Sequence, residues 1–188
     1  MHTMPNKPIK FQYDSEKAKQ AVLWLLHKNN GSMDKLQLVK LFFFADREHL
    51  AKYGRPIIGG TYYAMRFGPV CSELLDCLDS TATINTSLPF TLLDKQVAEK
   101  QEHQIPDEDW LSESDLEVLE DIYKNYGHID KFKLSDMTHD LKAYKKNMPP
   151  VNSRKLIPYE DFFEDLENSA KKMVEIIQDE QEAWADFL

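Results

Sequence analysis

The sequence predicts a mainly α-helical fold with a small antiparallel β element (α+β): one compact domain of about six to eight helices wrapped around a central apolar helix. Three observations predict it. From Leu36 to Ala45 only Gln37 and Lys40 are polar, so this helix must be covered on most sides. Amphipathic helical stripes recur before and after it, and one short aromatic, β-branched stretch is typical of a strand.

Length and composition support a single globular domain. The 188 residues suffice for one hydrophobic core, and 42% of them are hydrophobic. No apolar run is long enough to span a membrane, and the first residues lack the apolar region of a secretory signal, so we expect a cytoplasmic protein. Cys71 and Cys77 lie six residues apart on one expected helix and point in different directions, so we expect two free thiols.

The net charge of −9 hides an asymmetry along the chain. Residues 1–70 carry 11 Lys and Arg against 5 Asp and Glu, whereas residues 71–188 carry 12 against 27. An acidic half disfavours general nucleic-acid binding, which needs a cationic footprint, and suits a basic protein partner. The alternative interpretation is that an acidic surface only keeps the protein in solution.

The first half of the chain predicts an arm and two helices. Residues 1–14 contain two prolines and no periodicity, so they form an N-terminal arm. An apolar stripe predicts a helix over 15–29, capped by Asp14 or Ser15. After an Asn-Asn-Gly turn, the central helix begins at Ser32 or Asp34 and ends before a glycine. Such a pair resembles a helix-turn-helix, but its second helix lacks the exposed basic face of a recognition helix.

The middle of the chain predicts the β element. Residues 61–67 are β-branched and aromatic, which favours a strand. Gly68 and Pro69 are expected to turn the chain, with Pro69 in the first turn of a third helix that ends near Leu78. Residues 80–106 are mixed in pattern, and we interpret them as a hairpin or edge ribbon.

The second half predicts three or four further helices. Ser112 and Asp115 form an approximate capping box for a helix that ends at Gly127. Residues 129–147 make one or two short helices, and two prolines then break the pattern.

The last helix begins at Tyr159 or Phe162 and reaches about Trp184. Its apolar positions follow nearly a heptad spacing, so this face either packs on its own domain or lies in a partner's groove. We therefore divide the chain into an arm (1–14), a domain (15–147), a loop (148–158) and an acidic amphipathic C-terminal helix (159–188).

The residues propose no catalytic, metal or cofactor-binding site. Asp46 and His49 have the spacing of two metal ligands, but no third ligand follows in a usual pattern, so we favour a helix-end ion-pair cluster of Asp46, Arg47, Glu48 and His49. His139 is interpreted as a local anchor. An enzyme with a site assembled only in space remains the third hypothesis, and it predicts that His49→Ala or His139→Ala abolishes activity without unfolding the protein.

Two ordered blocks of residues carry a family resemblance. The first comprises Lys35-Leu36-Gln37, Leu41 to Asp46, Glu48-His49-Leu50, Tyr53-Gly54-Arg55-Pro56-Ile57, Tyr62, Ala64-Met65, Gly68-Pro69-Val70 and Ser72-Glu73-Leu74. The second comprises Leu111-Ser112, Tyr126-Gly127, Leu134-Ser135 and Thr138-His139. Together they resemble the Panacea domain, the SocA-like antitoxin family whose members are also described as phage-associated proteins. Three positions depart from the pattern: Gly60 replaces a frequent acidic residue, Cys71 a frequent Pro and Tyr144 a usual Trp.

The resemblance implies an antitoxin of a type II-like pair that neutralises a cognate toxin by direct contact, or that delivers it to an ATP-dependent protease. The acidic half of the chain suits a toxin that is basic in charge. The motif residues are expected to be structural, although the Gly68-Pro69-Val70 turn could also present a contact loop. The candidate partner-binding residues lie at the C-terminal end: Trp184, Phe187, Ile177, Met173, Glu164 and Asp165.

The alternative hypothesis is a DNA-binding transcriptional regulator with a winged-helix-like core. The basic half of the chain would supply its cations, namely Lys28, Lys35, Lys40, Arg47, Lys52, Arg55 and Arg66. Under the leading hypothesis we expect neither a nucleic-acid nor a membrane partner, and no cofactor. The two hypotheses differ in the steep salt dependence that specific DNA binding would show.

Overall fold

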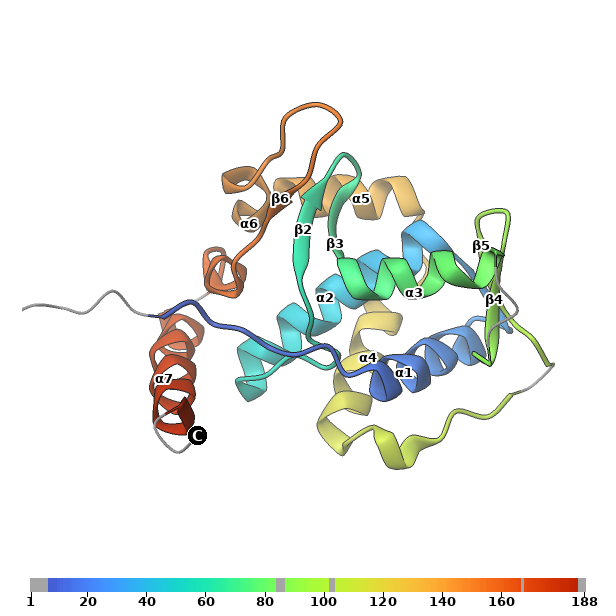
Figure 1. The fold of residues 1–188 in the computed structure, drawn as a ribbon, viewed down its shortest axis with the longest axis horizontal. Helices are drawn as coiled ribbons and strands as arrows, with labels where there is room; N and C mark the ends of the chain where they lie inside the picture. The colour runs from blue at the N-terminus through green and yellow to red at the C-terminus, as the bar shows by residue number, and fades with distance from the viewer. Residues whose placement is uncertain (1–6, 84–86, 102–103, 167, 186–188) are drawn as a thin grey trace, which may run out of the picture.

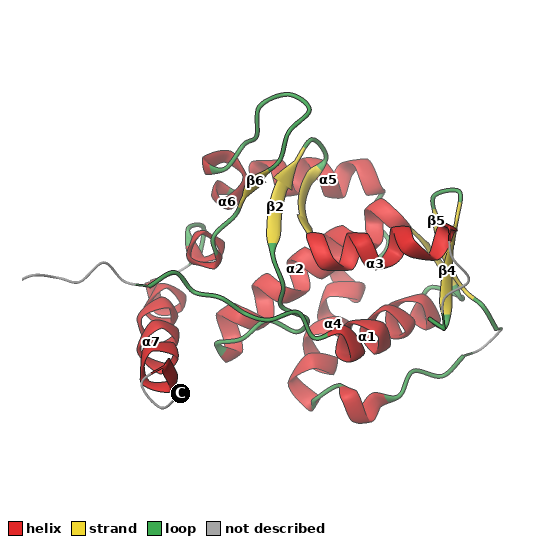
Figure 2. Cartoon of the chain, in the orientation of Figure 1, coloured by secondary structure: helices red, strands yellow, loops and turns green. Residues whose placement is uncertain are grey.

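The computed structural model describes residues 7–83, 87–101, 104–166 and 168–185. Within these ranges the chain forms seven α-helices and two small antiparallel sheets, which confirms the predicted α+β class. The central helix, α2 (Lys35–Tyr53), runs through the middle of the molecule (Figure 1). The cartoon in Figure 2 shows helices around it on several sides, with the strands in two separate places.

The other elements follow in chain order. The helices are α1 (Ser15–Lys28), α3 (Ser72–Thr83), α4 (Glu113–Tyr126), α5 (Lys131–Asp140), α6 (Lys142–Lys146) and α7 (Asn168–Ala185), with 3-10 helices η1 (Glu108–Trp110) and η2 (Tyr159–Phe163). One sheet has the order β1 (Ser32–Asp34), β5 (Gln96–Glu99) and β4 (Phe90–Leu93). The other has the order β3 (Gly68–Cys71), β2 (Tyr62–Met65) and β6 (Lys155–Leu156).

Helix α2 is the core element that its sequence predicts. Its N-cap Asp34 accepts a hydrogen bond from the backbone of Leu36, and Gly54 ends it with φ of 72°. Phe42 and Phe43 are fully buried in its middle. Because both ends carry strong local signals and the middle has no polar face, the sequence alone locates this helix.

Several other predictions are confirmed. Asp14 caps α1, and the Ser112–Asp115 capping box of α4 is present in both directions. The segment 80–106 does contain a hairpin, β4–β5, with Asp94 in the left-handed conformation at its turn. The segment 129–147 forms two short helices, α5 and α6.

The predicted Gly68-Pro69 turn is wrong. The chain turns at Arg66 and Phe67, and Gly68–Cys71 forms β3, which pairs with β2. Pro69 is tolerated because β3 is an edge strand, where a missing N–H leaves no ladder bond unmade. Helix α3 consequently begins three residues after Pro69 and extends to Thr83, beyond the expected end.

The C-terminal region and one strand also differ from expectation. The helix expected from Tyr159 or Phe162 is two elements, the 3-10 helix η2 and α7, which begins only at Asn168. Tyr159, Phe162 and Phe163 are buried in the core, and this burial sets the path of η2. The loop expected over 148–158 includes β6, and β1 was missed because its three residues carry no strand pattern by themselves.

The two ends of the described chain lie side by side, with the blue N-terminal segment crossing beside α7 in Figure 1. Gln181 of α7 accepts from the backbone N–H of Lys10 and donates to the carbonyl of the same residue, at 3.2 and 2.9 Å. Glu160 accepts from the backbone of Ile9 at 2.7 Å, and Ile9 itself is buried. The first described residues therefore link α7 and η2.

Candidate functional site

The motif residues of the two blocks meet around the buried Lys40. Its side chain is 2% exposed, and its Nζ donates a hydrogen bond to the carbonyl of Pro69 at 2.8 Å. Gly68 has φ of +97°, and a Cβ there would overlap Thr138 Oγ1 and approach Lys40 Nζ to 3.0 Å. Gly68 is thus required twice, by its backbone conformation and by the space that Thr138 and Lys40 leave.

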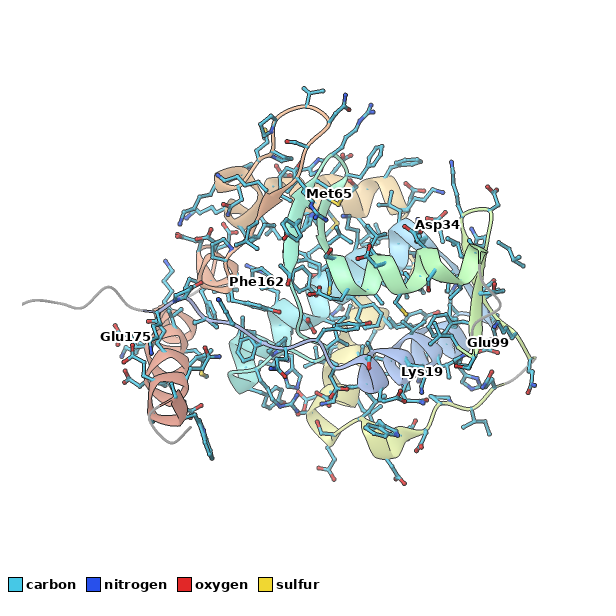
Figure 3. All side chains as sticks on the ribbon, in the orientation of Figure 1. Lys19, Asp34, Met65, Glu99, Phe162 and Glu175 are labelled. Carbon is cyan, nitrogen blue, oxygen red and sulfur yellow. The ribbon has the colours of Figure 1, made fainter. Side chains whose placement is uncertain are left out.

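The same cluster clamps the β2–β3 hairpin onto α5 and α6. Ser135 Oγ donates to the carbonyl of Phe67 at 2.8 Å, and Tyr144 donates to the carbonyl of Met65 at 2.9 Å. His139 stacks on Tyr144 with ring centroids 4.4 Å apart. Met65, labelled in Figure 3, lies on this hairpin near its tip. Phe67, in the turn of the hairpin, is 49% exposed.

Burial controls the charge state of the cluster. It lowers the pKa of the Lys40 ammonium to about 7, because a charge is poorly solvated there. The pKa of His139 is also lowered, first by burial and then by the nearby charge of Lys40. A lysine in the middle of an apolar helix was visible in the sequence, but its role was missed because its acceptor, Pro69, lies 29 residues away.

A second cluster forms around the buried carboxylate of Asp115. Arg55, Lys17 and His49 lie 2.9 to 3.1 Å from its oxygens, and the backbone of Ser112 donates to it at 2.9 Å. Burial acts to raise the pKa of this carboxyl, but hydrogen bonds from His49, Ser112 and Lys17 hold it well below its usual range. Asp115 therefore joins α1, α2 and α4, beyond the capping role that the sequence indicates.

This second cluster lacks the arrangement of a Ser-His-Asp triad. His49 Nε2 lies 3.1 Å from both Ser114 Oγ and Asp115 Oδ1, while Nδ1 faces the carbonyl of Arg55 at 2.7 Å. A triad places the carboxylate on one ring nitrogen and the nucleophile on the other. Here both share one nitrogen, so the geometry is that of an anchor.

The expected ion-pair cluster at 46–49 is wrong, because each member finds a partner elsewhere. Asp46 accepts hydrogen bonds from the backbone of Ile57, Ile58 and Gly59 and from the hydroxyl of Tyr62. Burial raises its pKa to about 6, against those hydrogen bonds.

The other members of that expected cluster turn outward or toward other elements. Arg47 donates to the carbonyl of Phe162 in η2 at 3.0 Å, and Glu48 pairs with Lys52 one turn along α2 at 3.1 Å. Residues that are adjacent in a helix point in different directions, so a sequence run of charges does not make a spatial cluster.

The remaining motif residues are mainly structural. Lys35 pairs with Asp79 at 2.6 Å, and Tyr53 donates to Glu117 at 3.0 Å. Leu36 packs against the core, and five others are buried in it or beside it: Pro56, Tyr62, Ala64, Val70 and Leu74. These motif residues therefore make their contacts within the domain.

Of the candidate partner-binding residues, several contact the domain itself. Met173 and Ile177 lie over Gly54 at the end of α2, and Ile177 is 2% exposed. Asp165 accepts from the backbone of Lys142 at the start of α6, and Glu164 pairs with Lys146.

The other two candidates differ from these. Trp184 is 72% exposed, so it is available to a partner. Phe187 lies outside the described residues. Figure 3 shows the labelled Glu175 on the side of α7 that faces away from the domain.

The cations invoked for DNA binding are mostly engaged. Lys28, Lys35, Lys52 and Arg55 form ion pairs with Glu120, Asp79, Glu48 and Asp115, in that order. Three of these four pairs, all except Lys52–Glu48, join the basic first half of the chain to the acidic second half. Lys40 is buried, and Arg47 donates to the carbonyl of Phe162. Arg66, on the hairpin turn, lies over the ring of Phe67 at 5.3 Å.

The residues that the structure describes offer neither a metal site nor a membrane-spanning helix. Among those residues, no group of three or more His, Cys, Asp and Glu side chains could hold a metal ion. None of the helices there is long and apolar enough to cross a membrane. Both cysteines are free.

Comparison with known proteins found one relationship. Neither the curated proteins nor the solved structures contain a match to this chain. A family model described as "Antitoxin SocA-like, Panacea domain" matches residues 38–145, more than half of the sequence. The matched range runs from the first turn of α2 through the hairpin to α6. It contains the second motif block and all of the first except Lys35-Leu36-Gln37. The chain therefore belongs to the SocA-like antitoxin family, as a Panacea-domain protein.

Proposed function

We propose that this protein is a cytoplasmic antitoxin that neutralises a cognate toxin by direct protein–protein contact. The observation that carries the proposal is the family match over residues 38–145. The clusters around Lys40 and Asp115 support it, because their polar side chains join helices to one another and hold the β2–β3 hairpin against α5 and α6. Binding a protein requires a shaped surface and no catalytic constellation.

The test is co-expression with the product of the neighbouring reading frame. If that product is the toxin, it should arrest growth when expressed alone, and this protein should restore growth and co-purify with it. The proposal is contradicted if the neighbouring product is toxic and this protein neither restores growth nor co-purifies with it.

Within this proposal, neutralisation proceeds either by masking the toxin or by delivering it to an ATP-dependent protease. The two differ in what happens to the toxin. An adaptor shortens the half-life of the toxin only in cells that contain the protease, whereas masking leaves its amount unchanged in both strains. Pulse-chase measurement of the toxin in matched strains distinguishes them.

DNA binding receives less support, since six of its seven invoked cations form ion pairs or hydrogen bonds within the protein. A gel shift with the promoter of its own gene at two salt concentrations is the direct check. Specific binding that weakens steeply with salt would favour the regulator hypothesis instead.

A further inference from the structure

A surface groove lies between the end of α1, α4 and the segment that precedes α4. Its volume is about 550 Å³. Trp24 of α1, Leu116 of α4 and Pro106 form an apolar lining, and Ile105 stands beside them with 81% of its side chain exposed. This is the opposite side of α2 from the hairpin in Figure 1, so the groove is separate from the Lys40 cluster.

The rim of the groove is acidic. Glu108 of η1 and Glu117 and Glu120 of α4 line it, and all three side chains are exposed. Glu117 and Glu120 are three positions apart, so they stand on the same face of α4 about one turn from each other. Apolar side chains with carboxylates beside them are complementary to a segment that carries both apolar and cationic side chains.

Cations of the protein itself already contact this acidic edge. Lys52 Nζ lies 3.8 Å from Glu117, which also accepts from Tyr53, and Lys28 contacts Glu120 within the groove. Lys28 Nζ lies 2.7 Å from Glu120 and 4.9 Å from the ring centroid of Trp24. A carboxylate together with an aromatic face is a favourable site for an ammonium or guanidinium group. Lys28 therefore occupies the place that a lysine or arginine of a partner would take.

The walls of the groove are fixed before any partner arrives. Gln20 of α1 accepts from the backbone of Asp107 at 2.9 Å, which ties the preceding segment to α1. Tyr123 of α4 donates to the carbonyl of Lys28 at 2.9 Å and lies 3.1 Å from Asn29 Oδ1, which ties α4 to the end of α1. A preformed groove loses little conformational freedom when it binds.

We propose that this groove docks a basic amphipathic helix of the toxin, with Lys or Arg residues one turn apart along the Glu117–Glu120 edge and apolar residues over Ile105 and Trp24. The inference rests on the proposed antitoxin function. It places toxin contact on the α1–α4 side of the molecule, away from the α7 residues that the sequence suggested.

A synthetic probe tests the groove without the toxin. In the background Trp110→Phe with Trp184→Phe, Trp24 is the remaining tryptophan. Titration with an amphipathic helical peptide of lysine and leucine should change the fluorescence of Trp24 until binding saturates. The same peptide with glutamate in place of lysine should leave the fluorescence unchanged. Glu108→Lys with Glu120→Lys should weaken binding of the lysine peptide at least about tenfold, and Lys28→Met should strengthen it about threefold.

The matched control carries the same charge change on α7, where Glu175 and Asp179 are exposed. Glu175→Lys with Asp179→Lys should bind the lysine peptide within about twofold of the parent, because nearby groups set the affinity more than net charge does. Equal weakening by both double variants, or no effect of Lys28→Met, overturns the groove assignment.

Growth rescue with the neighbouring toxin completes the test and separates the two proposals. If the parent protein rescues growth, the groove variant fails and the α7 variant succeeds, the toxin docks in the groove. If parent and groove variant rescue equally, the groove inference is overturned and the antitoxin function stands. If the parent itself fails to rescue against a toxic neighbour, the antitoxin function falls and the inference falls with it.

Discussion

At the residue scale, the buried cluster around Lys40 explains why small and unusual side chains occupy the motif positions. The carbonyl of Pro69 accepts a hydrogen bond from Lys40, and Thr138 fills the space beside Gly68. Each of these contacts joins the hairpin to a different helix. Changes here should therefore affect stability, which is measurable without knowing the partner.

Gly68→Ala should destabilise the protein by about 2 kcal/mol or more, because it adds a Cβ at positive φ where Thr138 Oγ1 already lies. Urea unfolding of the variant and the parent measures this. Gly31 also has positive φ, but its nearest neighbour is a side-chain atom of Glu99 at 3.6 Å, so Gly31→Ala should cost only about 1 kcal/mol. Equal costs at the two glycines would contradict the steric part of the argument.

Lys40 should make stability depend on pH. Its pKa in the folded protein is about 7, below the ordinary value of 10.5, so the unfolded chain holds the proton more tightly. Stability of the parent should therefore rise with pH between these values. Relative to Lys40→Met, the parent should gain about 2 kcal/mol between pH 7 and pH 9, measured by urea unfolding.

The contribution of Lys40 is the difference between the pH profiles of stability of the parent and of Lys40→Met. Other groups that titrate in this window, such as the buried Cys71, are present in both proteins, and their contributions cancel. The exposed Lys171 provides the control substitution, since Lys171→Met should leave the pH profile of the parent unchanged. Parallel profiles for Lys40→Met and the parent would mean that Lys40 keeps an ordinary pKa.

At the element scale, α7 is amphipathic in a way that serves its own domain. Ile177 and Met173 cover Gly54 at the end of α2, where a Cβ would come within 3.2 Å of Met173 Sδ and 3.8 Å of Ile177 Cγ1. The neighbouring Ile176 is 49% exposed on another face. The heptad-like spacing seen in the sequence is explained by this one-sided packing.

Two adjacent isoleucines test the packing of α7. Ile177→Ala should cost about 2 kcal/mol of unfolding free energy, because it removes buried methyl groups at the contact with α2. Ile176→Ala should stay within about 0.5 kcal/mol of the parent, as expected for a largely exposed side chain. Thermal and urea unfolding of both variants measure these two losses. A larger loss for Ile176→Ala than for Ile177→Ala would place the other face of α7 on the domain.

At the scale of the whole molecule, the two ends of the described chain stabilise each other. Lys10 and Gln181 exchange hydrogen bonds, and Ile9 is buried beside the acceptor Glu160. The arm of residues 1–14 and the C-terminal helix, separated in the sequence-based division, are therefore in contact.

Deletion of residues 1–10 should loosen α7, since it removes these contacts together. Limited proteolysis should then cleave between η2 and α7 faster than in the parent, because local opening governs access to the protease. Deletion of residues 1–6 alone keeps Ile9 and Lys10 and should leave the cleavage rate near that of the parent. If both deletions behave alike, the Lys10–Gln181 link does not hold α7.

The sequence by itself determined most of the helices, the central position of α2 and the family. It could do so because helical periodicity, caps such as Asp34 and turns such as Gly54 act within a few residues of the chain. It could not find β1 or β6, whose residues become strands only through their neighbours.

Only the tertiary structure decided where the charged groups go. Arg55 meets Asp115 across 60 positions and Lys40 meets Pro69 across 29, and no local pattern specifies such partners. For the same reason, the sequence placed toxin contact near α7, whereas the acidic groove between α1 and α4 is formed only by residues that meet after folding. A surface is made by residues that meet after folding, so its chemistry follows from the fold.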